Sequence, residues 1–413
     1  MTPLRQSNDG TGVIVLSPEV SKPRRCSRKE TPVTILIRNA KALVQDGFAD
    51  CDIRIADGVF GPIDIRAAEA SLTLDARGML VLPGLVDCHG DAFERHLMPR
   101  PKVAFDIDLA LHDADRALLA NGITTAFHGV TWSWEPGLRG PENARALVAA
   151  IERLRPSLGA DTRLHLRHET FNLDAEAEII AWLADGRIDV LAFNDHTEGT
   201  LKTRHRPDKV GKMVERSGLS ADGFAALVEQ VYARKSEVAA SLERLAAQAR
   251  ASGVPMLSHD DMTPAMRRWY RGLGVAIAEF PIDETTAREA AAYDEAIVFG
   301  APNVVRGGSH TGCPAAEEMV RKGLCTVLAS DYYYPALMLA PFALARSGAI
   351  AFADAWKLVS ENPARTFGLD DRGVIAPGKR ADLVLIEDGS RPRVAATIVA
   401  GKLVHLADQR LLA

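Results

Sequence analysis

Hydrophobic and polar positions change their period twice along this chain. From Val33 to Gly78, and again from Gly373 to the C-terminal end, short runs alternate apolar and polar residues in the manner of β-strands. The pair Asp57-Gly58 between two such runs predicts a hairpin turn. Because no helical period separates the strands within either segment, we expect the two segments to join in one small β domain.

Between these segments, buried apolar runs alternate with amphipathic helical stretches, as at 141–155 and 219–251. This order is typical of parallel βαβ units, and eight of them predict a (β/α)8 TIM-like barrel inserted in a small β-sandwich domain built from both termini. A doubly wound open sheet is the alternative, but no glycine-rich dinucleotide fingerprint follows an early strand. The eight strand candidates are Met79–His89, Gly122–His128, Arg163–Glu169, Val190–His196, Pro255–His259, Gly274–Phe280, Ala296–Ala301 and Cys325–Asp331.

We expect three parts in the domain organisation. Residues 1–30 mix basic and polar types around an apolar patch too short for a signal peptide, and they predict a poorly ordered N-terminal extension. Residues 31–80 and 372–413 form the β domain, and residues 81–371 form the barrel.

Composition narrows the class of protein. At 413 residues, 47% hydrophobic and 25% charged, the chain is an ordinary globular one. A net charge of -5 argues against non-specific nucleic-acid binding. The sequence contains no run of about 18 consecutive apolar residues, so we expect no membrane span. Five scattered cysteines without a CxxC motif indicate a reducing, cytoplasmic location, and the sequence leaves a homo-oligomer open.

Metal-ligand residue types recur at the ends of the predicted strands. His89 and Asp91 stand two apart, so a strand projects both from one face. Alone, this pair fits a hydrogen-bonded histidine beside a turn aspartate as well as a metal site. Barrel enzymes gather such residues at one rim, and burying so many of them without a metal is costly. The sequence therefore predicts a metal cluster, with further members in His168-Glu169, Asn194-Asp195-His196, Ser258-His259-Asp260-Asp261 and Ser330-Asp331.

Two basic segments predict an anionic substrate. The run Lys202–Lys212 has five basic residues against one acid, which fits either a solvated loop face or an anion-binding lid. The acidic balance of the chain favours the lid. Arg306–Gly312 follows the seventh strand, where barrel enzymes often bind phosphate through glycine-rich loops. With Lys102 and its neighbours after the first strand, these segments favour a polyphosphate over a neutral amide.

The pattern as a whole resembles the amidohydrolase superfamily. The resemblance rests on the strand Pro83–His89, the later histidine-bearing strands, a last strand ending in Asp331, and the tail Asn362-Pro363-Ala364 with Gly373–Val384. The chain is similar in more detail to a branch of that superfamily in the carbon–phosphorus lyase pathway of phosphonate metabolism. The segments that carry this closer similarity are His89–Asp91, Pro99–Val103, Leu164–Arg167, Asp195–Thr197, Ser258–Asp261, Gly300–His310 and Ser330–Tyr333.

The resemblance implies a metal-binding site. Many members carry a second histidine where Asp91 stands and a carboxylated lysine between two metals. Here Glu169 is the bridging candidate, with His168 as an alternative. Glu169, His196 and His259 fall on predicted strands three, four and five, one earlier than the usual superfamily positions, so either a strand is missing from the prediction or the barrel is irregular. The implied ligands are His89, Asp91, Glu169, His196, His259 and Asp331.

From these residues we expect a metal-dependent hydrolase. The cofactor is one or two divalent ions, with zinc expected first and manganese or iron as alternatives. Asp331 would orient a metal-activated water and accept its proton. The resemblance implies release of diphosphate from a ribose 5-triphosphate with a methylphosphonate at its anomeric carbon. The expected phosphate-binding residues are Lys102, Arg204, Arg206, Lys209, Arg306 and His310.

Two other functions stay open. The same scaffold could hydrolyse an amide or cyclic amide of a small anionic substrate, with the basic residues binding its carboxylate. A non-catalytic scaffold that keeps the barrel for assembly is the second, and the complete ligand set argues against it.

Overall fold

The computed structural model describes residues 34–45, 47–63, 70–100, 102–309 and 312–412. The predicted extension 1–30 and His310 lie outside them. The described part contains two eight-stranded sheets, one built from both ends of the chain and one from its centre. Among these residues, no helix is both long and apolar enough to span a membrane.

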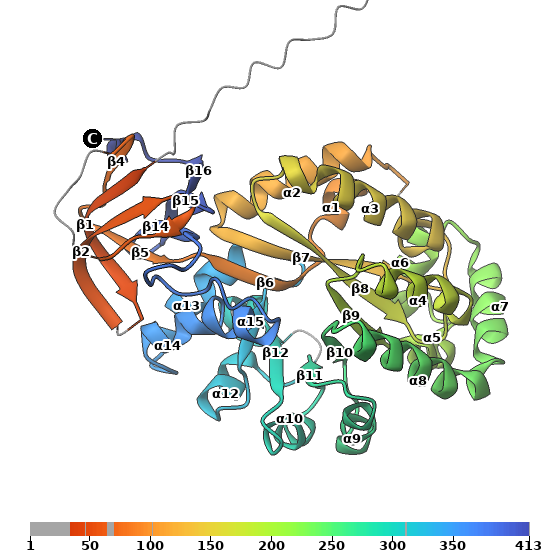
Figure 1. The fold of residues 1–413 in the computed structure, drawn as a ribbon. Coiled ribbons are helices and arrows are strands. Elements are labelled where there is room, and N and C mark those ends of the chain that lie inside the picture. Colours follow the sequence, from red (N-terminus) through yellow and green to blue (C-terminus); the bar gives the residue numbers. More distant parts are fainter. Residues whose placement is uncertain (1–33, 46, 64–69, 101, 310–311, 413) are drawn as a thin grey trace, which may run out of the picture. The chain divides into compact units, whose positions relative to one another are not determined.

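The first sheet joins the two ends of the chain (Figure 1). Its order is β16-β15-β14-β5-β1-β2-β3, and β4 pairs with β1. The antiparallel pair β5–β14 links the N-terminal strands to the C-terminal ones, with Pro83 opposite Leu383. This confirms the predicted β domain. Its strands are β1 (Ile35–Val44), β2 (Gly47–Ala56), β3 (Val59–Phe60), β4 (Leu72–Asp75), β5 (Met79–Pro83), β14 (Leu383–Glu387), β15 (Arg393–Val399) and β16 (Lys402–Leu406).

The predicted Asp57-Gly58 hairpin joins β2 to β3, which pair antiparallel. Both turn residues have positive φ, 53° and 79°. Two consecutive residues with positive φ match the twist of the strands they connect, and Asp-Gly adopts that conformation readily.

The second sheet is the predicted parallel barrel. Its strands pair in chain order from β6 to β13, and all eight predicted strands occur. The first and last strands meet where Asp331 N donates to His89 O at 2.8 Å and Asp91 N donates to Asp331 O at 3.0 Å. The strands are β6 (Leu85–Gly90), β7 (Ile123–Trp132), β8 (Asp161–Glu169), β9 (Val190–Asn194), β10 (Met256–His259), β11 (Ile277–Glu279), β12 (Ala296–Gly300) and β13 (Val327–Ala329).

The first predicted strand, Met79–His89, is two strands rather than one. β5 belongs to the terminal sheet, and β6 opens the barrel beside Ile123. Gly84 lies between them, and a Cβ there would collide with the side chain of Thr124. The chain thus passes from one sheet to the other at a residue that has no room for a side chain.

The helices surround the barrel strands, and two predictions about them were wrong. The stretch 219–251 forms two helices, because the chain turns at Ala233 and Arg234. The basic run Lys202–Lys212 lies mostly in α5 and α6 instead of a loop. The helices are α1 (Glu94–Leu97), α2 (Ile107–Ala120), α3 (Pro141–Leu154), α4 (Glu176–Ala184), α5 (Thr197–Thr203), α6 (Pro207–Ser217), α7 (Ala221–Tyr232), α8 (Lys235–Ala251), α9 (Pro264–Gly272), α10 (Glu284–Ala291), α11 (Ala301–Arg306), α12 (Ala316–Arg321), α13 (Pro335–Arg346), α14 (Phe352–Lys357) and α15 (Glu361–Thr366).

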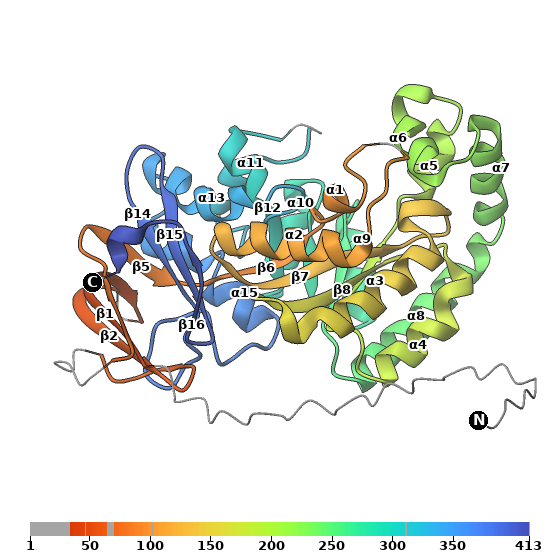
Figure 2. The same cartoon turned by 90° about the horizontal axis from the view of Figure 1, so that it is seen from above.

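Figure 2 shows α5, α6 and α7 as neighbours at one side of the barrel. Proline begins α6 at its first turn, where no backbone donor is needed, and Gly218 ends it with a φ of 72°. Ser220 then caps α7 by accepting from Gly223 N at 3.1 Å. These local signals divide the segment after β9 into short helices.

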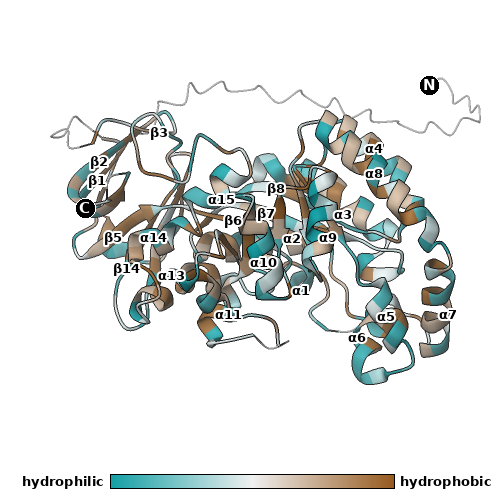
Figure 3. Cartoon of the chain, turned by 90° about the horizontal axis from the view of Figure 1, so that it is seen from below, coloured by the Kyte–Doolittle hydropathy of each residue, from teal (hydrophilic) through white to brown (hydrophobic). Residues whose placement is uncertain are grey.

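The barrel is apolar below and polar at its carboxyl rim. Figure 3 shows hydrophobic residues along the barrel strands and more hydrophilic ones on the surrounding helices. Leu257 and Ile277 belong to a buried apolar cluster. Two residues further, on the same strand faces, stand His259 and Glu279. The strands therefore present polar side chains on top of a hydrophobic base.

Candidate metal centre

Five of the six predicted ligands fall into two compact groups of donor atoms. In the first group are His89, Asp91 and Asp331, from the adjoining ends of β6 and β13. In the second, His196 and His259 lie with Asp260. Within each group the donor atoms are all within 4.8 Å of one another. The structure thus brings together residues that are up to 242 positions apart in the sequence (331 less 89).

A single carboxylate, Glu279, orients one histidine from each group. Its Oε1 lies 2.8 Å from His89 Nδ1, and its Oε2 lies 2.7 Å from His259 Nδ1. Burial alone would raise the pKa of Glu279, but the two imidazoles outweigh it and hold that pKa well below its usual value. Because both Nδ1 atoms are engaged, both Nε2 atoms are left to bind a metal.

Sequence reasoning missed Glu279 because it lies inside an apolar strand and not in a polar cluster. The available signal was a carboxylate between Ala278 and Phe280, since a charge in a buried strand needs a partner.

Glu169, the predicted bridging ligand, supports His196 in the same way. Its Oε1 lies 2.7 Å from His196 Nδ1. The charge of Glu169 raises the pKa of His196 to about 10. Burial opposes ionisation of Glu169, but His196 outweighs it and lowers the pKa of Glu169 to about 2. A metal bridge through Glu169 stays a prediction, since the carboxylate is outside both donor groups.

The alternative bridge, His168, has a different environment. It alternates with Arg167 and Glu169 along β8, so it projects from the opposite face of the strand. Burial lowers its pKa to about 4, and neither ring nitrogen has a hydrogen-bond partner among the described residues. The third to fifth barrel strands do supply Glu169, His196 and His259, because the described residues contain no additional barrel strand.

Asp260 completes the second group; it stands in a strand-end segment of the predicted cluster but not in the ligand set that the resemblance implies. Its Oδ2 lies 3.6 Å from Nε2 of both His196 and His259. Its backbone has a φ of 58°, as Asp331 has a φ of 55°. Left-handed backbone is uncommon for residues other than glycine and clusters at functional sites. Both strained positions turn a carboxylate toward the donor groups.

Two arginines also contact the first group. Arg167 Nη1 donates to Asp91 Oδ2 at 3.1 Å, and Arg139 Nη2 lies 3.6 Å from the same oxygen. Arg139 is otherwise held by Glu94 in a two-point ion pair. These charges contribute to a pKa of Asp91 below its usual value, against the effect of burial. Asp91 is therefore ionised and available as a ligand at neutral pH.

A cavity of about 200 Å³ opens onto the centre. Its wall includes His89, His259 and Asp331, so ligands from both groups face one space. Arg167, Asp260 and Asn303 are further polar residues of its wall. Burial raises the pKa of Asp331, which brings this carboxylate closer to the range of a general base.

The predicted phosphate-binding residues that the structure describes do not line this cavity. Arg204 pairs with Glu229 at 2.6 Å, and Arg206 pairs with Asp208 at 2.8 Å. Lys209 is exposed on α6. Arg204 and Arg206 lie between α5 and α6, and Lys209 lies within α6. Their role in holding phosphates stays a prediction.

The two remaining described residues of that set belong to other surfaces. Lys102 lines a surface hollow together with residues of α6. Arg306 donates to Tyr332 Oη at 3.3 Å, just after Asp331. Arg95 Cζ lies 5.8 Å from the centre of the same Tyr332 ring, so both arginines contact this tyrosine.

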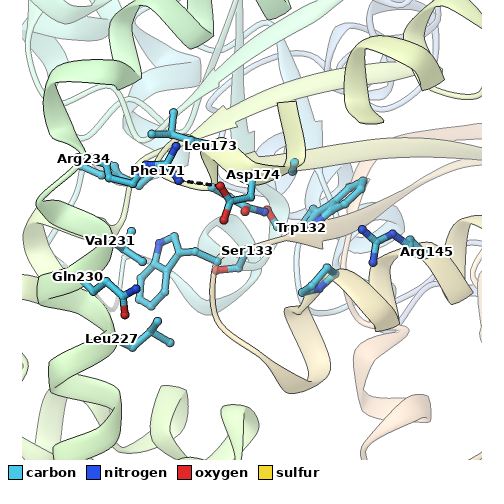
Figure 4. Close-up of a pocket in the computed structure, with 14 residues that line it drawn as sticks. Trp132, Ser133, Arg145, Phe171, Leu173, Asp174, Leu227, Gln230, Val231 and Arg234 are labelled. Carbon is cyan, nitrogen blue, oxygen red and sulfur yellow. Dashed lines mark hydrogen bonds and ion pairs between the residues drawn. The ribbon is translucent and has the colours of Figure 1, made fainter. Parts of the chain in front are cut away.

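A second cavity of about 280 Å³ lies beyond the ends of β7 and β8 (Figure 4). Trp132 and Phe171 form part of its wall. On one side Arg234 pairs with Asp174 at 2.7 Å. None of the described residues that line it is a predicted ligand or phosphate-binding residue.

The donor set fits divalent cations. Imidazole nitrogens combined with carboxylate oxygens suit zinc, and they also suit manganese and iron. The nitrogen that would bind is left free in His89 and His259 by Glu279, and in His196 by Glu169. Carboxylates that orient metal-binding histidines are a recurring feature of metal sites.

Comparison with known proteins relates the chain to one family. Residues 80–404 match the model of the amidohydrolase family. The chain is 33% identical to alpha-D-ribose 1-methylphosphonate 5-triphosphate diphosphatase of Escherichia coli (strain K12), over 85% of this chain and 94% of the relative. It is 25% identical to an adenine deaminase of Methylobacterium sp. (strain 4-46), over 94% of this chain and 61% of that protein. Among solved structures, a D-hydantoinase covers 92% of the chain with a TM-score of 0.61 at 14% identity, and that likeness concerns the fold.

Proposed function

The chain belongs to the amidohydrolase family, and on this premise we propose that it cleaves a phosphoanhydride, releasing diphosphate from alpha-D-ribose 1-methylphosphonate 5-triphosphate in phosphonate catabolism. The observation that carries the proposal is the match to the diphosphatase of Escherichia coli (strain K12), which includes 94% of that protein. The adenine deaminase match includes 61% of its relative at lower identity. The two-group donor set supports a metal-dependent reaction.

The residues of the centre divide the work. Glu279 and Glu169 engage Nδ1 of the three histidine rings, which leaves Nε2 of His89, His196 and His259 as the nitrogens that would hold a metal. A divalent cation bound there would activate water and neutralise phosphoryl charge. We assign to Asp331 the role of general base, which accepts the proton of the attacking water. Its carboxylate borders the cavity, and burial raises its pKa.

The metal, the location and the assembly are parts of the same proposal. Zinc is the first expectation, and manganese or iron fits the same donors. The cytoplasmic location and a homo-oligomer stay predictions.

The test is a diphosphate-release assay on the metal-loaded protein. Chelation should abolish release, and Asp331→Asn should lower kcat by roughly 100-fold or more. Asp354→Asn, on the exposed face of α14, is the matched control and should leave kcat unchanged. Substrate turnover that survives complete metal removal contradicts the proposal.

The alternative reaction, hydrolysis of an amide or cyclic amide, is favoured by the adenine deaminase match over nearly the whole chain. Adenine and hydantoin substrates belong in the same assay for that reason. Turnover of either one without diphosphate release would replace the proposed function by this alternative.

A further inference from the structure

Arg167 is a buried cation inside the candidate metal centre. It is 5% exposed, and it lines the cavity beside His89 and His259. Among the described residues, Asp91 is its hydrogen-bond acceptor. Its Nε is buried and has no hydrogen-bond partner in the described part of the chain. Arginine carries five N–H donors, and buried donors are normally satisfied, so the unused ones point to a ligand.

The neighbouring strand makes room for this side chain. Gly129 on β7 lies opposite His165 of β8, two residues before Arg167. A Cβ at Gly129 would lie 3.2 Å from Arg167 Cδ, which is closer than ordinary contact. The glycine therefore leaves space for the arginine stem to reach the rim of the barrel.

The charge of Arg167 restricts what the centre can bind. A guanidinium next to a divalent cation is repelled unless an anion lies between them. Asp91 is already shared with Arg139, and a metal would compete for its oxygens. A neutral substrate would leave the remaining donors of Arg167 unpaired, whereas a phosphoryl group offers several oxygens at the spacing of the guanidinium fork.

Among the described residues, no other arginine and no lysine lines this cavity. Arg204 and Arg206, which were predicted to bind phosphate, pair with carboxylates on the outer helices. Beside a bound cation, Arg167 is therefore the arginine placed to add positive charge next to the reacting group.

We propose that Arg167 binds the phosphoryl group at the metal centre, donating its unpaired N–H groups to phosphoryl oxygens beside the ligands His89 and Asp331. In identifying that group as part of the substrate, the inference rests on the proposed function. The binding of an anion by Arg167 is measured without turnover.

The test compares Arg167→Gln and Arg167→Lys with the wild-type holoenzyme. Metal content is measured first, and each protein is then titrated calorimetrically with inorganic phosphate. We expect both variants to keep their metal. Arg167→Gln should bind phosphate roughly 10- to 100-fold more weakly, since it loses charged hydrogen bonds. The phosphate affinity of Arg167→Lys should lie between those of the wild type and Arg167→Gln, because lysine keeps the charge but loses the paired N–H donors of the guanidinium group.

Arg372→Gln is the matched control. Arg372 is also a buried arginine, and it pairs with Asp161 at the opposite end of β8. Its replacement should lower stability without changing phosphate affinity. Acetate, titrated in parallel, should bind weakly to every variant.

Three results would overturn the inference. Unchanged phosphate affinity in Arg167→Gln excludes anion binding by this residue. If Arg167→Gln loses its metal as well as its phosphate binding, Arg167 only holds the ligand Asp91 in place. Arg167-dependent binding of acetate but not phosphate replaces phosphoryl by carboxylate. If Arg167-dependent phosphate binding is found but no diphosphate is released, the inference holds and the proposed function fails.

Discussion

Among the residues of the centre, Glu279 has the largest positioning role, because its one carboxylate contacts two histidine rings. We expect Glu279→Gln to weaken metal binding by roughly 10- to 100-fold, because an amide holds the imidazoles less firmly and no longer polarises them. Metal titration of the purified variant measures the change. Glu289→Gln, on the outer helix α10, serves as the control and should bind metal normally. Equal affinities in both variants would show that Glu279 is not needed to orient the rings.

The Glu169–His196 pair should give the metal-free protein a pH-dependent stability. The pKa of His196 is raised to about 10, so its contribution is complete below its ordinary pKa of 6.5 and is lost as pH rises through about 10. The pKa of Glu169 is lowered to about 2 from 4.5, so its contribution is complete above pH 4.5 and is lost as pH falls through about 2. The stabilising contribution of the pair is thus complete between pH 4.5 and 6.5.

Glu169→Gln should therefore destabilise the chelated protein most within that window, and less at pH 9–10. Urea unfolding at pH 5.5 and pH 9.5 measures the difference. A loss of stability that is equal at both pH values would mean that the pair does not carry the effect.

Sequence reasoning found donors better than it found their supports. His89, Asp91, His196, His259 and Asp331 follow strands whose apolar runs are readable, so their meeting at one rim was predictable. The interactions of Arg167, Glu279 and Asp260 depend on side-chain direction across different strands and on a left-handed backbone. A single sequence does not record these features.

At the scale of elements, the junction of β5 and β6 determines where the barrel begins. Gly84→Ala should destabilise the protein by about 1–3 kcal/mol, because a Cβ would collide with Thr124, whose hydroxyl donates to Leu85 O at 3.2 Å. Chemical unfolding measures the loss. Gly211→Ala is the control, since a Cβ there meets open space within α6, and it should be neutral or stabilising. Equal effects of the two substitutions would contradict the packing argument.

The elements themselves were predictable to different degrees. Buried strands reveal themselves by apolar runs, and the eight barrel strands were found. The single strand predicted over Met79–His89 and the single helix over 219–251 both failed at short interruptions. In each case the periodicity continues across the break, and partners distant in sequence decide which sheet or helix the residues join.

At the scale of the molecule, barrel closure and metal binding involve the same residues. Asp87 accepts from Ser330 N at 2.9 Å and from Ser330 Oγ at 2.5 Å, joining β6 to the end of β13. His89 on β6 and Asp331, two residues after β13, are donors of one group. A bound cation would therefore tie the first barrel strand to the last.

Metal removal should consequently destabilise the junction of β6 and the end of β13 more than the rest of the molecule. A ligand that binds the folded state at 100 times its Kd stabilises it by about 2.7 kcal/mol, and chelation should remove that amount. Hydrogen exchange with and without chelator locates the change. We expect faster exchange at Asp331 N, whose hydrogen bond to His89 O closes the barrel, and unchanged exchange in β15, within the terminal sheet. Uniform acceleration across both sheets would show that the metal stabilises the whole fold rather than its closure.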